Sequence, residues 1–415
     1  MIPTRAATML KRYRYRAYPT KGQIDPIARL FGCCRVVFND ALIARETARR
    51  DGEKVPNRGE LSVMLTESKR TPERAWLTEV SSAPLQQALA DLDRGYRNFF
   101  DSLTGKRKGP KMRPPRLRRR SNRQSARFTR NTFKVLETTH GVGYVTLSKI
   151  GRFRFSLSRP LPSKPSSVTL IQEPDGRYYV SFVVEVAPVE PPPANTVVGV
   201  DVGLTDLACI VRSDGTRERV ENPRNFRKAE RRLVQAQRDL SRKQKGSKNR
   251  TKARKRVATH HRKVREARLD HHHKLALHLV RENQAVAVEG LNVKGLARTR
   301  LAKSVHDAGW GILFRLIHEK ATKYGREVHV ISQWEPTSQV CSVCGTLDGK
   351  KPLSVREWTC SGCGTRLDRD YNAAVNIVVA AGLAETLNAC GGDVRLRLSE
   401  ADTCEAGTRR TDLVA

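Results

Sequence analysis

The spacing of apolar residues changes twice along the first half of the chain. Apolar and basic residues alternate over 12–18, which predicts a β-strand. Over 24–100 apolar residues recur every three or four positions, which predicts helices. Over 126–186 the spacing returns to two, with an Asp-Gly turn at 175–176 that is typical of a β-hairpin. We therefore expect a small antiparallel barrel or sandwich that includes the first strand and carries the helices as an insertion.

A proline-rich linker at 190–193 precedes a second pattern. Short apolar runs predict strands over 197–202, 206–212, 216–220, 285–289 and 327–332. Helical spacing predicts helices over 224–281, around 305–324 and from 371 onward. Three antiparallel strands followed by alternating helices and strands have the order of an RNase H-like domain. The predicted fold class is therefore α/β multidomain, with this domain after the β domain.

The charge of the chain predicts a polyanionic partner. Its 415 residues include 78 Lys and Arg against 42 Asp and Glu, a formal net charge of +36. This excess indicates nucleic acid or an anionic membrane surface. No apolar run approaches the length that spans a bilayer, and residues 1–11 lack the apolar core of a signal peptide. We therefore expect a cytoplasmic nucleic-acid-binding protein with no membrane partner.

Two segments concentrate the basic residues. One is a proline-containing linker over 104–124, and the other is the break between two helices near 245–249. Acidic residues are scarce in both, whereas solvated faces usually mix both signs. A solvated loop and a solvated helical hairpin remain the alternatives. The residues predicted to contact nucleic acid are Lys106, Arg107, Lys108, Arg242, Lys243, Lys245, Lys248, Arg250, Lys252 and Arg254.

Three acidic residues fall where an RNase H-like order would bring them together. Asp201 and Glu289 end valine-rich runs, and Asp370 opens the last predicted helix. Carboxylates are natural ligands of Mg²⁺, and two such ions about 4 Å apart serve phosphodiester hydrolysis. We predict a catalytic site that holds Mg²⁺, with two ions. The alternative for Asp201 is a turn residue, for Glu289 a strand end that faces solvent, and for Asp370 a helix N-cap. Asp368 is the other candidate for the third acid.

Four cysteines have the spacing of a zinc ribbon. Cys341 and Cys344 form one Cys-x2-Cys pair, Cys360 and Cys363 form the second, and a glycine follows each pair. We predict one structural Zn²⁺, because four thiolates leave no open position for catalysis. Iron or a redox dithiol is the alternative. The other five cysteines form no disulfide framework.

Five motifs together resemble the TnpB family, RNA-guided nucleases encoded by small insertion sequences and long described as OrfB-type transposases. The matching segments are Gly-Cys-Cys-Arg-Val-Val-Phe-Asn at 32–39, Gly-Val-Asp-Val-Gly-Leu at 199–204, Val-Glu-Gly-Leu-Asn-Val at 288–293, the Thr-Ser-Gln run with the first cysteine pair at 337–345, and Asp-Arg-Asp-x-Asn-Ala-Ala at 368–374. The resemblance covers roughly residues 10–385. One departure is Gly290, where many relatives are expected to have Asn.

The resemblance implies roles and boundaries. It assigns the catalytic acids to Asp201, Glu289 and Asp370 and zinc to the four cysteines. The implied parts are a wedge domain (1–20 and 125–190), a helical recognition lobe with basic linker (21–124), a RuvC-like nuclease (196–339 and 367–388), a zinc-binding insertion (340–366) and a disordered tail (389–415).

The resemblance also implies partners. They are a guide RNA from the element's right end and target double-stranded DNA, cut beside a short motif, with no small-molecule substrate. Three alternatives remain open. A strand-transfer transposase usually has Glu as its last acid, an inactive RNA-guided repressor would lack an acid, and a compact type V CRISPR effector would be encoded beside a repeat array.

Overall fold

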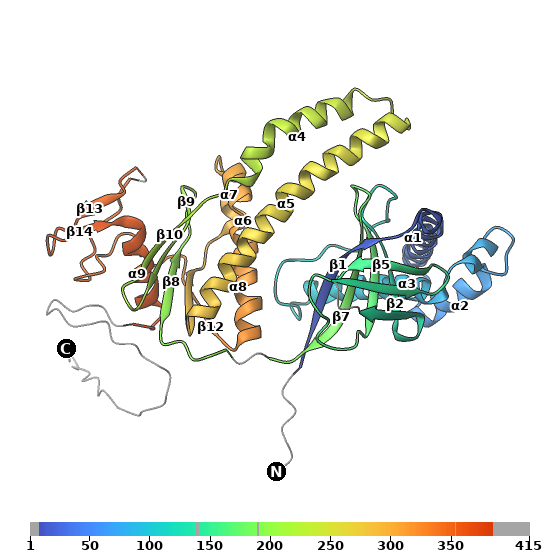
Figure 1. Cartoon of the computed structure of the whole chain (residues 1–415), viewed down its shortest axis with the longest axis horizontal. Helices are drawn as coiled ribbons and strands as arrows, with labels where there is room; N and C mark the ends of the chain where they lie inside the picture. The colour runs from blue at the N-terminus through green and yellow to red at the C-terminus, as the bar shows by residue number, and fades with distance from the viewer. Residues whose placement is uncertain (1–7, 138–140, 189–190, 353, 385–415) are drawn as a thin grey trace, which may run out of the picture. The chain divides into compact units, whose positions relative to one another are not determined.

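The structure is a computed structural model that describes residues 8–137, 141–188, 191–352 and 354–384 (Figure 1). The expected disordered tail, 389–415, lies outside the described residues. The chain divides into two compact units, residues 1–188 with 235–260 and residues 189–234 with 261–415. Each unit is described by itself.

The first unit contains a curled antiparallel sheet of seven strands, in the order β2-β6-β7-β1-β5-β4-β3. The strands are β1 (Met9–Tyr18), β2 (Gln124–Thr129), β3 (Phe133–Glu137), β4 (Val142–Leu147), β5 (Gly151–Ser156), β6 (Ser167–Gln172) and β7 (Tyr178–Val186). β1 pairs with β7 and β5, which confirms that the first strand joins the later sheet. The expected barrel is a sheet with β2 and β3 at its two ends, so in the described residues it is curled without closing.

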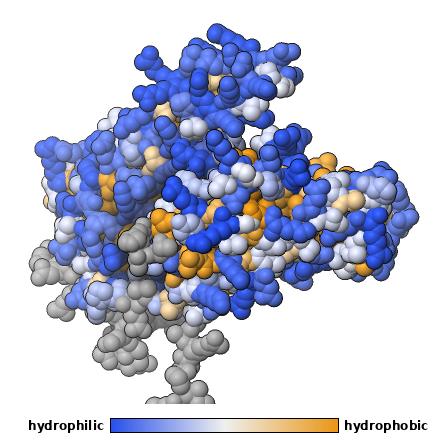
Figure 2. Space-filling model, turned by 45° about the vertical axis from the view of Figure 1, so that its right-hand side comes forward, coloured by the Kyte–Doolittle hydropathy of each residue, from blue (hydrophilic) through white to orange (hydrophobic). Residues whose placement is uncertain are grey.

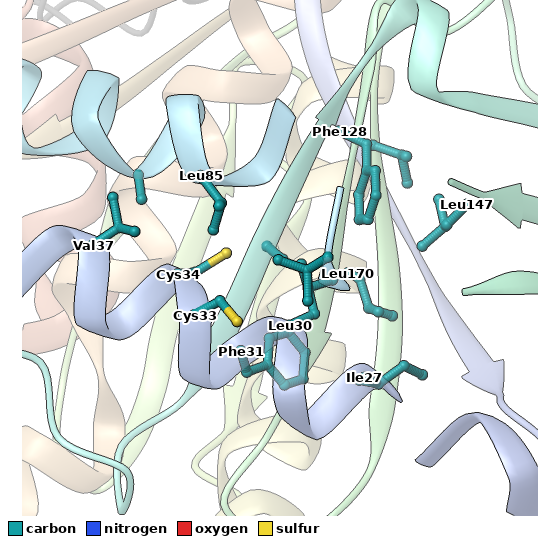
Figure 3. Packing of buried hydrophobic residues seen from close by; sticks show 14 of the residues in the cluster. Ile27, Leu30, Phe31, Cys33, Cys34, Val37, Leu85, Phe128, Leu147 and Leu170 are labelled. Atoms are coloured by element: carbon teal, nitrogen blue, oxygen red, sulfur yellow. The ribbon is translucent and has the colours of Figure 1, made fainter. Parts of the chain in front are cut away.

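The helices inserted after β1 pack on this sheet. They are α1 (Lys21–Arg50), α2 (Arg58–Ser68) and α3 (Ser82–Leu103), with short 3₁₀ turns at Ala75–Glu79 and Arg130–Thr132. Apolar residues of α1 at spacings of three and four, such as Ile27, Leu30 and Cys34, face Leu85 of α3 and strand residues including Phe128 (Figure 3). Helices and sheet therefore share one hydrophobic core.

Aromatic rings fill the centre of the sheet's inner face. Tyr15, Phe155 and Phe182 are buried, and their ring centroids lie 5.3 to 5.9 Å apart in tilted arrangements. Gly143 lies opposite Phe155 on the neighbouring strand, and a Cβ there would overlap the ring. The glycine thus makes room for the aromatic cluster.

The second unit contains a five-stranded sheet in the order β10-β9-β8-β11-β12. The strands are β8 (Val197–Asp201), β9 (Asp206–Arg212), β10 (Arg217–Glu221), β11 (Ala285–Glu289) and β12 (Glu327–Ile331). β8, β9 and β10 pair antiparallel, whereas β11 is parallel to both β8 and β12. All five strands predicted for this region are therefore confirmed.

Helices cover both faces of this sheet. The helices that follow β10 along the chain are α4 (Asn225–Ser241), α5 (Lys248–Glu282), α6 (Val293–Leu296), α7 (Ala302–Ala308), α8 (Trp310–Tyr324) and α9 (Arg369–Ala380), and residues 235–260 of α4 and α5 belong to the first unit. α5 and α8 pack on the face of Val198 and Val200, whereas α9 packs on the face of Val197 and Ala287. The helix expected around 305–324 is confirmed as α8 over 310–324, and Gly309, with φ of 69°, separates it from the shorter α7.

Helices α4 and α5 form the predicted pair of basic helices with a break between them. The face of these helices that Figure 2 shows is mostly hydrophilic. In the described part of the chain, no helix combines the length and apolarity needed to cross a bilayer.

Candidate functional site

The three predicted acids lie at one edge of the second sheet. Asp201 ends β8 and Glu289 ends β11, and these parallel neighbours are in register at Val200 and Val288. Side chains alternate along a strand, so each carboxylate shares the sheet face of the residue two positions earlier. Those residues, Gly199 and Ala287, are on the face that α9 covers. Asp370, in the first turn of α9, therefore approaches the same point.

The carboxylates of this edge act on one another electrostatically. Burial, and then the charges of Asp370 and Glu289, raise the pKa of Asp201 to about 8, while Arg369 acts in the opposite direction. Burial also raises the pKa of Glu289. Without a cation, this group of acids holds a proton at neutral pH. A set of half-buried carboxylates in mutual repulsion fits a divalent ion with hard oxygen ligands.

Asp368 and Asp370 have different roles in the helix. One oxygen of Asp368 accepts the backbone N–H groups of Asp370 and Tyr371, at 3.1 and 3.0 Å, so Asp368 is the N-cap of α9. Its other oxygen accepts a hydrogen bond from Arg219. Asp370 makes no cap and interacts electrostatically with Asp201. The geometry therefore favours Asp370 over Asp368 as the third carboxylate.

Two arginines beside Asp370 were not identified from the sequence. Arg219 on β10 has Nη1 3.9 Å from Oδ2 of Asp370. Arg356, in the zinc-binding segment, has Nη1 3.3 Å from the same oxygen and Nη2 3.0 Å from the hydroxyl of Thr205. No local pattern marks either residue, because the partners lie far along the chain.

Asp206 and Cys209 of β9 also lie beside Asp370. Their ligand atoms and that of Asp370 are all within 4.8 Å of one another. Burial raises the pKa of the Cys209 thiol to about 12, and the nearby carboxylates of Asp370 and Asp201 contribute. Cys209 is therefore a neutral thiol at physiological pH, and a poor metal ligand.

The four predicted zinc ligands come together. The sulfur atoms of Cys341 and Cys363 are 3.8 Å apart, and those of Cys344 and Cys360 are 3.6 Å apart. Tetrahedral coordination at about 2.3 Å places sulfur atoms about 3.8 Å apart. The four cysteines therefore fit one Zn²⁺, as the sequence predicted.

The two Cys-x2-Cys turns are built alike. In the first, Gly345 donates its N–H to the carbonyl of Cys341 at 2.9 Å; in the second, Gly364 donates to Cys360 at the same distance. Their φ angles are 76° and 72°, a region that favours glycine. Threonine hydroxyls, Thr346 and Thr365, accept from Cys344 and Cys363 at 3.1 and 3.2 Å.

Two buried asparagines join the zinc-binding segment to α9. Asn372 and Asn376 both donate to the backbone carbonyls of Thr337 and Val340, at distances from 2.7 to 3.2 Å. Asn372 also accepts the N–H of Ser342, which lies between two cysteine ligands. The first cysteine turn is thus fixed to the helix that carries Asp370, two residues from that acid.

Most residues predicted to contact nucleic acid lie on the surface. Among the ten, Arg107 and Arg250 are half-buried and the other eight are exposed. Arg250 donates to the carbonyls of Leu240 and Lys243 at 3.0 and 2.7 Å, so it closes the turn between α4 and α5.

A further basic surface lies on the outer face of the first sheet. Arg14 stacks over Tyr179 at 3.9 Å, Arg152 over Tyr144 at 4.2 Å, and Arg154 over Tyr18 at 5.0 Å. Alternation of basic residues over 12–18 predicted the strand, but not the stacked partners, which come from other strands.

Family models and relatives agree on one family. Residues 181–300 match the IS605 OrfB family of probable transposases, residues 310–377 a Cas12f1-like TNB domain, and residues 9–54 a helix-turn-helix domain. Despite this last description, residues 9–54 form one strand and a single long helix.

Two relatives extend over almost the whole chain. A Streptomyces pristinaespiralis protein named "Putative RNA-guided DNA endonuclease" is 43% identical, over 93% of this chain and 92% of its own. The Escherichia coli K12 protein InsQ, with the same description, is 31% identical over 92% and 94%. The Cas12f1 chain of a Cas12f1–sgRNA–target DNA complex has a similar fold, with a TM-score of 0.53 and 12% identity over 89% of this chain and 98% of that chain.

Proposed function

The chain belongs to the TnpB family, and we propose that it is an RNA-guided, Mg²⁺-dependent DNA endonuclease of an insertion sequence. Its guide is an RNA from the element's right end. Its substrate is double-stranded DNA that pairs with the guide beside a short target-adjacent motif. The observation that carries the proposal is the meeting of Asp201, Glu289 and Asp370 at one sheet edge, in a chain of net charge +36.

The proposed reaction is phosphodiester hydrolysis. Asp201, Glu289 and Asp370 would hold Mg²⁺ as a pair of ions. Bound Mg²⁺ supplies an activated water and neutralises charge on the phosphate. The protein's part is to hold the carboxylates in place around the ion. The raised pKa of Asp201, caused by burial and then by its two acidic neighbours, makes the cluster depend on a cation for full ionisation.

The zinc-binding segment has a structural role in this proposal. Four thiolates close the coordination of Zn²⁺, which leaves no position for substrate. The hydrogen bonds of Asn372 and Asn376 connect this segment to α9. Zinc would therefore support the position of Asp370 without taking part in hydrolysis.

We assign the parts of the chain accordingly. The proposed wedge domain is 1–20 with 125–190, the recognition lobe 21–124, the RuvC-like nuclease 196–339 with 367–388, and the zinc insertion 340–366. The exposed basic residues over 106–108 and 242–254 and the stacked arginines of the first sheet would bind phosphates and bases.

Exchange of the guide tests the proposal. Purified protein with its co-purified RNA is expected to cut DNA that matches the RNA beside a fixed short motif. With a new guide segment, the cut should move to the new matching sequence, because base pairing supplies the specificity. Cleavage that ignores the new guide would favour a strand-transfer transposase. Binding that follows the guide without cleavage would favour an RNA-guided repressor.

A further inference from the structure

Arg219 lies in the same cross-strand row as the candidate catalytic acids. On the antiparallel strands β10, β9 and β8, Arg219 is opposite Cys209, and Cys209 is opposite Asp201. Residues opposite one another share a face of the sheet, and neighbouring strands are about 4.8 Å apart. The Arg219 backbone is therefore about 10 Å from that of Asp201, on the face that α9 covers.

Its guanidinium joins two elements of the site. Nη1 donates to Asp206 of β9 at 2.9 Å, and Nη2 donates to Asp368, the N-cap of α9. The guanidinium also lies over the ring of Tyr371, 4.8 Å from its centroid. Asp370 is 3.9 Å away, beyond hydrogen-bonding distance. Arg219 is thus bonded to Asp206 and Asp368 but not to Asp370.

Charge explains why an arginine is needed here. Asp206, Asp368 and Asp370 bring three carboxylates to one small region, and like charges at such range repel. A planar guanidinium with fixed donors neutralises two of them and holds their geometry. Arg356 differs, because it contacts Asp370 directly at 3.3 Å and its side chain is half exposed. A metal ion at Asp370 would displace Arg356, whereas Arg219 would keep its bonds to Asp206 and Asp368.

We propose that Arg219 is a positioning residue for the proposed nuclease reaction. It fixes the first turn of α9 to the β9–β10 edge and neutralises Asp206 and Asp368, which leaves Asp370 to bind the divalent ion. This inference rests on the proposed function. Arg219 touches neither substrate nor metal in this role and acts through the carboxylates beside it.

The test compares Arg219→Ala and Arg219→Lys with the control Arg212→Ala. Arg212 also bridges two carboxylates, Glu218 and Glu282, from the other end of β9, about 20 Å from the start of that strand. Two quantities are measured on the full chain. One is the Mg²⁺ concentration for half-maximal cleavage by the guide-loaded protein, and the other is the rise in melting temperature that Mg²⁺ causes in RNA-free protein.

For Arg219→Ala we expect about a 10- to 100-fold higher Mg²⁺ midpoint in both measurements, the effect typical of losing a residue that orients metal ligands. Arg219→Lys keeps the charge but cannot donate to both carboxylates in the same geometry, so its Mg²⁺ midpoint should lie between those of the wild type and Arg219→Ala. Arg212→Ala should keep the wild-type midpoint. Zinc content and RNA affinity should be unchanged in all three. If Arg219→Ala does not fold, the Arg219→Lys midpoint carries the test.

Two results would overturn the inference. A lower melting temperature with an unchanged Mg²⁺ midpoint would make Arg219 merely structural. A lower Mg²⁺ midpoint would make it a competitor of the metal. Failure of the proposed function looks different: wild-type protein would then not cut guide-matched DNA at any Mg²⁺ concentration, while the melting measurement would still compare Arg219 with Arg212.

Discussion

Replacing Gly199 by Ala should separate α9 from the sheet and so disturb the acid cluster. Gly199 lies in β8, two residues before Asp201, and the backbone of α9 crosses directly over it. A Cβ at Gly199 would lie 2.7 Å from Cγ2 of Val378 and nearer still to the carbonyl oxygen of Ala374. Ordinary contacts begin at about 3.5 Å, and the carbonyl oxygen is the nearer atom, so the helix must retreat by at least about 1 Å. Asp370 is one turn from Ala374 and would move with it.

Two effects are expected. Overpacking of this kind costs about 1–3 kcal/mol of unfolding free energy, which lowers the melting temperature by several degrees. Misplacement of a reacting group by about 1 Å costs about 100-fold in rate. The assay is single-turnover cleavage of guide-matched DNA at saturating Mg²⁺, with thermal unfolding measured in parallel.

Gly311→Ala is the matched control. Gly311 is exposed in α8, in the same unit, and a Cβ there meets nothing within 4 Å. Alanine in an exposed helix is favoured by about 0.5–1 kcal/mol, so this variant should be slightly more stable and cut normally. If Gly199→Ala unfolds and cuts like the wild type, the packing of α9 on β8 does not set the position of Asp370.

Further predictions concern the acids and the zinc site. Burial and acidic neighbours raise the pKa of Asp201 to about 8, so the metal-free protein should lose stability as pH rises from about 4 to about 8, by at most about 5 kcal/mol. Asp201→Asn should remove this pH dependence in thermal unfolding and also abolish stabilisation by Mg²⁺. A steeper loss of stability with rising pH in the Asn variant would contradict this assignment to Asp201. Asp370→Ala should abolish cleavage with RNA affinity retained, whereas Asp368→Ala should mainly weaken the cap of α9, by about 1 kcal/mol. The reverse pattern would exchange their roles. Cys360→Ser should reduce the zinc content from about one ion per chain, measured by elemental analysis. Asn372→Ala should keep zinc but slow cleavage, because Ser342 then loses its acceptor on α9; zinc loss instead would place Asn372 in zinc binding alone.

Local patterns in the sequence were sufficient for several features. Short continuous apolar runs located the strands that bear Asp201 and Glu289, because both faces of each strand are buried. The Cys-x2-Cys spacing predicted the zinc ligands, since a turn of fixed length sets the distance between each pair. In both cases neighbours along the chain carry the information.

Other features depend on residues far apart in sequence, and only the tertiary structure decided them. Arg219 and Asp368 are 149 residues apart, and their pairing follows from strand register and from how α9 crosses the sheet. The Asn372 contacts with residues 337–342 and the choice of Asp370 over Asp368 have the same origin. At Gly309 the sequence does not decide even the local structure, because a glycine within apolar helical spacing is compatible with one helix or two. Its φ of 69° follows from packing of α7 and α8 on the sheet, where the hydrophobic contacts of both helices outweigh continuity of one backbone.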